Sequence, residues 1–294
     1  MLRLLLATTV LMGLAGAAGA VTLGVGGPEV VRGQRFGGQC AGCQFSGRTL
    51  TGAHFMGADF SRAALVGADL RSATITASNF AGSDFTRADA RGAVIVGSNM
   101  AGANFADASL QNLSARAANF SGANLARARL QESELVASVF QSANMVGADL
   151  RESNLTHSHF SGANASRANF SEAELVAAHL GGGNFEGANF SGASLQMAHL
   201  AGGMFNRANF TDADLTRANI QGADLSRVRG LTQAQVSRAC GGPGTQLPAG
   251  LTASRCQTRT HTRTVMVPGH PNIVVQMPRP PRPPRPPAAP RPPQ

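Results

Sequence analysis

Several features are missing from this chain of 294 residues, and each absence narrows what it can be. Lysine is absent, so all 25 basic residues are arginine, and with 16 acidic residues the formal net charge is +9. No proline lies between Pro28 and Pro243, which suits a stretch whose backbone forms a continuous hydrogen-bond ladder. Beyond the N-terminal region, no apolar run approaches the roughly 20 residues of a membrane span.

The motifs of common enzymes are missing as well. There is no glycine-rich phosphate loop, no His-Glu-x-x-His helix and no strand-turn-helix nucleophile elbow. The Ser, His and Asp residues are scattered, without a pattern that would enclose a pocket. We therefore expect no enzymatic activity, no catalytic residues and no cofactor.

What the chain does have is a five-residue repeat. From Phe45 to Leu225, each residue numbered with a multiple of five is called position i, which gives 37 repeats without an insertion or deletion. Position i holds 34 large apolar residues and three alanines, including 14 of the chain's 15 Phe. Position i−2 is Ala, Ser or Gly in 34 repeats, and position i+2 is Gly in 16. Residues two apart in an extended segment face the same side, so i−2 and i should share an interior, with a corner at i+1 and i+2.

Repetition at so short a period predicts a solenoid, in which each turn buries its apolar side by stacking on its neighbours. An amphipathic helix would need a period near 3.6, and glycine at the corner positions would cost it roughly 1 kcal/mol each. The predicted core ladder runs through position i and includes Phe45, Phe60, Phe80, Phe105, Phe120, Phe140, Phe160, Phe190 and Phe210.

Ala-Asp-Leu-Arg-Ser at 68–72, Ala-Asn-Phe-Ser-Gly at 118–122 and Ala-Asp-Leu-Thr-Arg at 213–217 resemble the A(D/N)LXX unit of pentapeptide-repeat proteins. The resemblance covers 43–227 and implies an all-β fold, a right-handed quadrilateral parallel β-helix of about nine coils. Residues 20 apart should then stack on adjacent coils. It also implies an alternative function, since some members are DNA-mimicking topoisomerase (gyrase) inhibitors. That role needs a strongly acidic rod in the cytoplasm.

The segments before the repeat point to export. Residues 1–20 have the features of a signal peptide, with Arg3 before an apolar stretch and a small-residue cleavage site ending at Ala20. We expect cleavage after Ala20 and a periplasmic or secreted protein; an uncleaved membrane anchor is the alternative. Residues 21–42 are interpreted as a lead-in that covers the first coil.

The segments after the repeat are predicted to be a cap on the end of the rod and a tail that follows the cap. Residues 228–256 are predicted to form a capping helix and a Cys-closed loop, with Thr232 as N-cap, Gln235 completing a capping box and Gly241 as the stop. Residues 257–294 form a basic, proline-rich tail, expected to be disordered or a polyproline II rod.

The four cysteines are predicted to be structural. Cys40-x-x-Cys43 could be a redox pair, half a zinc site or a cap, but it lacks a βαβ context and a second closely spaced pair. Similar leaders precede the first coil of many pentapeptide-repeat proteins, so the resemblance favours a cap that can oxidise to a disulfide. A redox enzyme using Cys40 and Cys43 remains an alternative. We expect Cys240 and Cys256 to pair and close a loop.

Charge is distributed unevenly along the chain. Residues 41–230 carry 14 Arg against 15 acidic residues, whereas 231–294 carry 8 Arg and no acidic residue. The tail could attach the protein to an anionic cell-envelope component, with Arg279, Arg282 and Arg285 along one edge. No aromatic residue interleaves with these arginines, which makes nucleic acid an unlikely partner. The alternative is a solvated spacer.

A constant register places like residues in columns on the rod surface. The columns are His159, His179 and His199; Glu132, Glu152 and Glu172; and Arg87, Arg127, Arg167, Arg207 and Arg227 with Asp107. The histidine column could bind a transition metal or respond to pH. Solvated faces are the alternative for all three. The sequence therefore predicts a non-catalytic exported scaffold, monomeric or an end-to-end dimer, that binds an unidentified protein or envelope polyanion.

Overall fold

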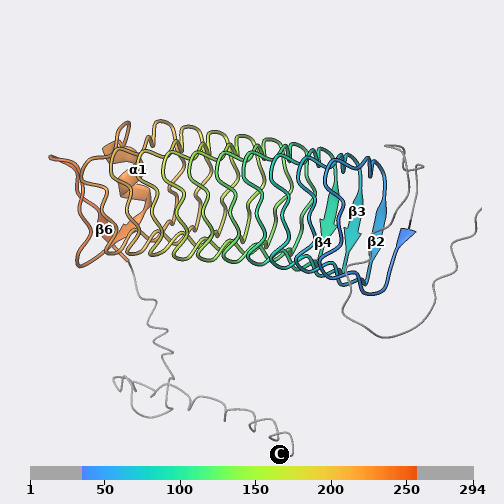
Figure 1. Cartoon of the computed structure of the whole chain (residues 1–294). Coiled ribbons are helices and arrows are strands. Elements are labelled where there is room, and N and C mark those ends of the chain that lie inside the picture. Colours follow the sequence, from blue (N-terminus) through green and yellow to red (C-terminus); the bar gives the residue numbers. More distant parts are fainter. Residues whose placement is uncertain (1–34, 257–294) are drawn as a thin grey trace, which may run out of the picture. The chain divides into compact units, whose positions relative to one another are not determined.

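The computed structural model describes residues 35–256, which form a rod of stacked four-sided coils (Figure 1). Parallel bridges join residues 20 apart, such as Asn79 with Asn99 and Asn99 with Asn119, so each coil contains four pentapeptides. The fold is the predicted right-handed parallel β-helix. The predicted signal peptide, most of the lead-in and the tail lie outside the described residues.

Regular strands occur on one wall at the N-terminal end of the rod. They pair in parallel in chain order, with Phe55 opposite Ile75 and Ile75 opposite Ile95. Threonine flanks Ile75 in the third strand and valine flanks Ile95 in the fourth, and such side chains favour extended backbone. Over the rest of the repeat, most coils pair through single bridges. The strands are β1 (Arg35–Phe36), β2 (His54–Met56), β3 (Thr74–Thr76) and β4 (Val94–Val96).

The interior is the predicted ladder. Every position i from Phe45 to Leu225 is buried, including the nine phenylalanines named above. Rings on successive coils stack, as in Phe120 on Phe140, whose centroids lie 5.2 Å apart, and Phe140 on Phe160, at 5.0 Å. Such stacked pairs add specific geometry to the area that they bury. Side chains therefore fill the rod along its length.

In the pentapeptide 59–63 every backbone N–H group has an acceptor. In 59–63, the N–H groups at i and i+2 donate to carbonyls of the next coil at 2.7 and 2.9 Å, and that of Asp59 donates to the previous coil at 2.9 Å. The N–H of Ala63 closes the corner on the carbonyl of Phe60 at 3.1 Å. The fifth donor, the N–H of Ser61, bonds to the Asp59 carboxylate at 2.9 Å. No donor of this unit is left unpaired, which buried or crowded backbone requires.

The hydrogen bond that the backbone N–H at i+1 donates to the side chain at i−1 explains why Asn and Asp are the commonest residues at i−1. All twenty Asn and Asp residues at that position accept the N–H two residues later. Their amides also bond between coils, as when Asn79 donates to Asp59 at 3.0 Å. An Asn or Asp at i−1 therefore has a structural role, which His, Val or Arg at i−1 does not share.

Corner residues at i+2 adopt the left-handed region whether or not they are glycine. Twenty non-glycine corner residues have φ between 47° and 62°. Long side chains lean onto the following coil, where a glycine leaves room for them. The Cγ of Arg167 lies 3.7 Å from where a Cβ on Gly187 would sit, and the carboxylate of Glu172 occupies the space of a Cβ on Gly192. Several corner glycines thus accommodate a neighbouring coil as well as a turn.

Helix α1 (Gln233–Arg238) lies at the C-terminal end of the rod (Figure 1). Thr232 is its N-cap, and the capping box with Gln235 is confirmed. The Gln235 amide also donates to the carbonyls of Phe210 and Ala213, at 2.7 and 2.9 Å. Val236 is the one buried residue of the helix, and it packs onto the hydrophobic core of the rod.

The prediction that Gly241 stops this helix was wrong. The helix ends at Arg238, and Ala239 is already extended. Cys240 then rejoins the ladder, donating its N–H to the Ala218 carbonyl at 2.9 Å and accepting from the Ile220 N–H at 2.9 Å. The ladder bonds, rather than a glycine cap, set the end of the helix. The closing strands β5 (Cys240–Gly241) and β6 (Ser254–Arg255) pair in parallel.

Candidate functional site

The outer walls and the ends of the rod carry the candidate surfaces, since side chains fill its interior. The histidine column is the most ordered of them. The rings of His159 and His179 stack with centroids 4.5 Å apart, and those of His179 and His199 at 4.7 Å, with interplanar angles of 4° and 5°. His179 is half-buried between two exposed neighbours. Burial lowers the pKa of His179, and the charges of His159, His199 and His157 lower it further.

The predicted metal site is not formed by this column. Parallel rings one coil apart hold their nitrogens side by side, whereas a transition metal needs ring nitrogens converging on one point at about 2 Å. Across residues 35–256, no group of three His, Cys, Asp or Glu residues could hold a metal ion. The response to pH predicted for this column stays a prediction.

The glutamate column is exposed at a different corner of the rod. Glu132, Glu152 and Glu172 occupy i+2 on successive coils, each with a left-handed backbone. Glu172 folds back over Gly192 rather than reaching away from the surface. The column gives this corner a run of three negative charges.

The arginine column contains both paired and unpaired charges. Arg127 forms a two-pronged ion pair with Asp107, with both N–O distances at 2.7 Å. Further along, Arg167 and Arg207 line a surface hollow of about 340 Å³ on either side of Gly187. The pair of Arg207 with Glu186 is long, at 3.8 Å, and solvent-exposed. The other residues that line this hollow, called the arginine hollow below, are Val146, Ser166, Asn184 and Glu186.

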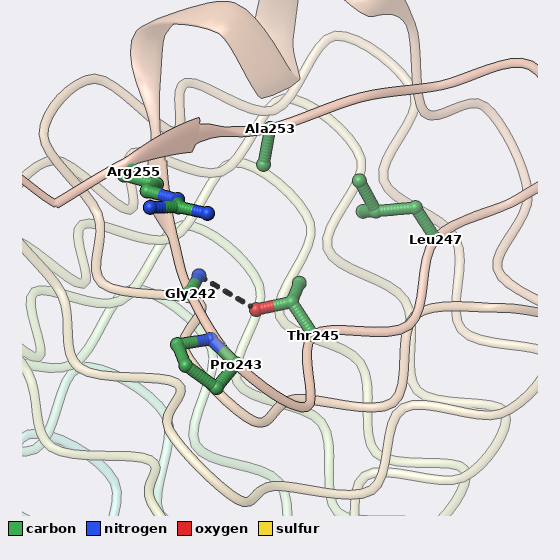
Figure 2. A pocket seen from close by; sticks show the side chains of 6 residues that line it. All are labelled: Gly242, Pro243, Thr245, Leu247, Ala253 and Arg255. Atoms are coloured by element: carbon green, nitrogen blue, oxygen red, sulfur yellow. Dashed lines mark hydrogen bonds between the residues drawn. The ribbon is translucent and has the colours of Figure 1, made fainter.

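A second hollow, of about 480 Å³, lies in the loop that follows α1 (Figure 2). Within it the N–H of Gly242 donates to the Thr245 hydroxyl at 3.1 Å. The residues that line it are Gly242, Pro243, Thr245, Leu247, Ala253 and Arg255. None of these is a carboxylate, histidine or thiol, so this hollow holds no acid–base pair or nucleophile other than a hydroxyl.

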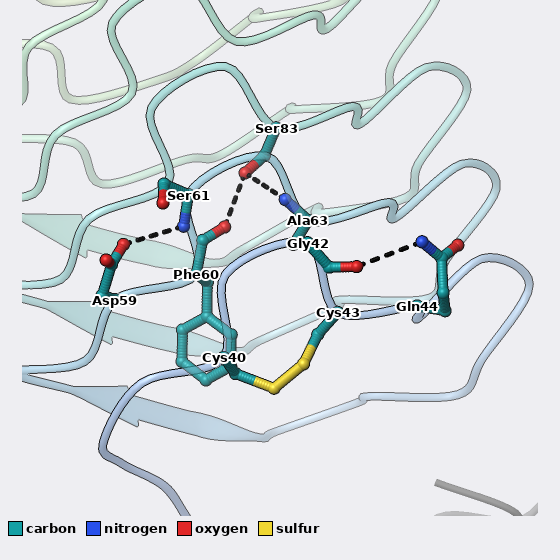
Figure 3. The surroundings of a disulfide bond; sticks show 9 residues. All are labelled: Cys40, Gly42, Cys43, Gln44, Asp59, Phe60, Ser61, Ala63 and Ser83. Atoms are coloured by element: carbon teal, nitrogen blue, oxygen red, sulfur yellow. Dashed lines mark hydrogen bonds between the residues drawn. A yellow bond between two sulfur atoms is a disulfide. The ribbon is translucent and has the colours of Figure 1, made fainter. Parts of the chain in front are cut away.

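The four cysteines form two disulfides, and no described cysteine is free. Cys40 and Cys43 are joined across a corner of the first coil (Figure 3), where the N–H of Cys43 donates to the Cys40 carbonyl at 3.2 Å. Cys240 is joined to Cys256 and closes the loop after α1. Both bridges lie at ends of the described rod, where stacking on a neighbouring coil is incomplete.

Two other predictions concern attachment. The tail residues Arg279, Arg282 and Arg285 lie outside the described residues. Over 35–256, the structure has no helix with the length and hydrophobicity that crossing a membrane would take. Sequence reasoning missed the arginine hollow, although the alternation of Arg and Gly at 127, 147, 167, 187 and 207 was visible in the sequence.

Comparison with protein families matches the repeat almost from end to end. The matches cover 39–106 and 116–229, well over half of the chain. The family described as pentapeptide repeat region matches at 116–190 and 135–210, and that described as pentapeptide repeats (8 copies) at 39–76, 68–106 and 193–229. No curated protein sequence matches the chain.

Solved structures of repeat proteins are similar to this one. HetL, a pentapeptide repeat protein involved in heterocyst differentiation regulation from the cyanobacterium Nostoc sp. strain PCC 7120, is 26% identical, with a TM-score of 0.46 over 68% of this chain and 91% of HetL. QnrB1, a plasmid-mediated fluoroquinolone resistance protein, is 20% identical, with a TM-score of 0.37 over 70% and 92%. A protein of the Arabidopsis thaliana thylakoid lumen is 26% identical, with a TM-score of 0.27 over 36% and 70%.

Proposed function

Because this chain belongs to the pentapeptide-repeat family, we propose that it is a non-catalytic scaffold whose rod presents a partner-binding wall. In this proposal the protein is exported, and its Arg/Pro tail attaches it to an anionic component of the cell envelope. The filled interior supports a contact surface rather than an enzyme, because chemistry generally needs a pocket that excludes water.

The observation that carries the anchoring proposal is the segregation of charge. Residues 35–199 carry 11 Arg against 12 acidic residues, whereas 200–256 carry 6 Arg against 3. Residues 257–294 add 6 Arg and no acidic residue. From residue 200 onward the sequence thus carries an excess of positive charge, and long-range attraction to a polyanion scales with such an excess.

The alternative of a DNA-mimicking gyrase inhibitor has less support in this chain. Duplex DNA carries one negative charge per roughly 1.7 Å of axis. A rod whose first 165 described residues have a net charge of −1 does not reproduce that density. The alternative of a redox enzyme using Cys40 and Cys43 would need a reactive thiol beside a substrate pocket, and neither described hollow includes these residues.

Co-sedimentation with isolated cell envelopes tests the anchor. The mature chain, 21–294, is compared with a version carrying Arg279→Gln, Arg282→Gln and Arg285→Gln, and with one ending at Cys256, at low and high salt. We expect only the unmodified chain to pellet fully, and salt to release it, because exposed charges are screened beyond about 10 Å at 0.1 M. Equal pelleting of all three proteins would refute the tail as anchor.

A further inference from the structure

We propose that the arginine hollow is a binding site for an acidic glycan, in which Arg167 and Arg207 hold the carboxylate of a sugar acid. This deepens the proposed function, since it rests on the rod wall being a binding surface. It assigns the partner chemistry and the place on the wall. The site is separate from the tail, so the two can be tested apart.

The hollow exists because one corner lacks a side chain. Gly187 lies between Arg167 and Arg207 in the same column, one coil from each. The backbone at such corners accepts Arg, Glu, Ala and Met with φ near 57°, so a side chain at 187 is not excluded by conformation. Its absence lets the stem of Arg167 lie against the corner, 3.7 Å from where a Cβ would sit, with its charged head beside the hollow.

The two guanidinium groups are available to a ligand. Within residues 35–256 Arg167 has no ion-pair partner. Arg207 meets Glu186 only at 3.8 Å, with 77% and 53% of the two side chains exposed, and such pairs contribute little. Arg127, two coils earlier, is by contrast fully engaged by Asp107 at 2.7 Å. Two cations that share one hollow favour an anion between them.

The remaining lining residues select the kind of anion. The side-chain oxygen of Asn184, Oδ1, accepts the backbone N–H of Glu186 at 3.0 Å. This bond fixes the Asn184 side chain and leaves its NH₂ group as a donor. Ser166 supplies a hydroxyl, and Val146 an apolar surface. A sulfate has no hydroxyl group to donate to Glu186, and a phosphate dianion has only one. A sugar acid satisfies both signs, because its carboxylate pairs with arginine while its hydroxyls donate to Glu186.

The size of the hollow agrees with this class of ligand. A volume of about 340 Å³ lies at the lower end of the range for small-molecule sites, roughly 300–1,000 Å³. The hollow is open to solvent on the wall of the rod, so a sugar unit could be bound while it remains part of a longer chain. A polymer with a carboxylate on each unit would also experience the positive charge of Arg227, one coil further along the same column.

The test is a titration of the full mature chain, 21–294, followed by backbone amide NMR. The ligands are glucuronate, glucose as the uncharged sugar, and inorganic phosphate. We expect glucuronate to shift the amides of Ser166 and Gly187 saturably, and glucose and phosphate not to do so. Arg167→Gln should weaken glucuronate binding about tenfold to a hundredfold, as loss of a charge-assisted contact does. Arg87→Gln, in the same column but outside the hollow, is the matched control.

The proposal is overturned if Arg167→Gln binds glucuronate as tightly as the unmodified chain, if Arg87→Gln weakens binding equally, or if phosphate produces the same shifts. Unchanged amide spectra away from the hollow show that each variant is folded. Envelope pelleting of Arg167→Gln separates the two proposals. Pelleting without glucuronate binding leaves the anchor intact and rejects only the hollow. Glucuronate binding with no pelleting of any protein rejects the anchor.

Discussion

Acidification should destabilise the rod at the histidine column, and His179→Asn should remove most of that sensitivity. The lowered pKa of His179 means that the folded chain holds this proton less tightly than the unfolded chain, whose histidine titrates near 6.5. Stability is therefore retained above pH 6.5 and is lost as the pH falls below 6.5 through the folded-state pKa. In the unfolded chain the charged ring of His179 is fully hydrated, and the repulsion from its histidine neighbours is also relieved.

The size of the effect follows from the ring spacing. Two unit charges at 4.5 Å repel by about 1 kcal/mol in bulk water and by about 4 kcal/mol at an effective dielectric of 20. The column faces solvent, so the lower value applies. His179 has a histidine on both sides, which gives a loss of about 2 kcal/mol. For a chain of this size that corresponds to a melting temperature lower by about 4–8 °C.

The assay is thermal unfolding at pH 7.5 and pH 5.0 of the unmodified chain, His179→Asn and His54→Asn. Asparagine suits the site, because Asn119 and Asn219 occupy the same column, and Asn at i−1 accepts the backbone N–H of the residue at i+1. His54 also occupies i−1, but its ladder partner on the next coil is Thr74.

Between pH 7.5 and pH 5.0 the carboxylate of Asp69 keeps its charge, so its contribution to stability does not change in this assay. The hydrogen bond from Arg71 is the largest cause that lowers the pKa of Asp69, to about 2, so the stability from this carboxylate is lost only below about pH 3.8. We expect acid to lower the melting temperature of the unmodified chain and of His54→Asn by similar amounts, and that of His179→Asn by less. An equal acid-induced loss in all three proteins would refute the electrostatic reasoning.

Three further predictions concern the ends and corners of the rod. Replacing Cys240 and Cys256 by Ser should cost about 3 kcal/mol in denaturant unfolding, as expected for a loop of about 15 residues, and an unfolded, unreduced chain that labels at both thiols would show that the bridge does not form. Gln235→Ala should speed amide hydrogen exchange in α1 by about tenfold, because the capping box and two bonds to the last coils are lost together; unchanged exchange would contradict this. Gly192→Ala should lower the melting temperature more than Gly202→Ala, because both have positive φ but only the first displaces a carboxylate of the neighbouring coil; equal losses would show that backbone strain alone matters.

The register could be predicted from the sequence because each step is local. The large residue at i and the small residue at i−2 recur every five residues without a shift in register. A single inserted residue would have moved the apolar side chains that follow it to the solvent-facing side. The position of every buried phenylalanine of the repeat follows from that spacing. The capping box follows from the Thr-x-x-Gln pattern at 232–235, after the repeat. The stacking of residues 20 apart follows from the resemblance to pentapeptide-repeat proteins. The columns of like residues follow from it as well.

Tertiary structure alone decided what the outer side chains do. The spacing put three histidines in a column, but only the parallel rings show that their nitrogens do not converge on a metal. The spacing also put Arg127 and Arg167 in the arginine column. Only the contacts show that Arg127 is paired with Asp107 and that Arg167 lines a hollow. The helix ends at Arg238 because Cys240 is hydrogen-bonded to Ala218 and Ile220 of the preceding coil. A period fixes which residues face outward, whereas their pairing depends on side-chain direction and on the separation between coils.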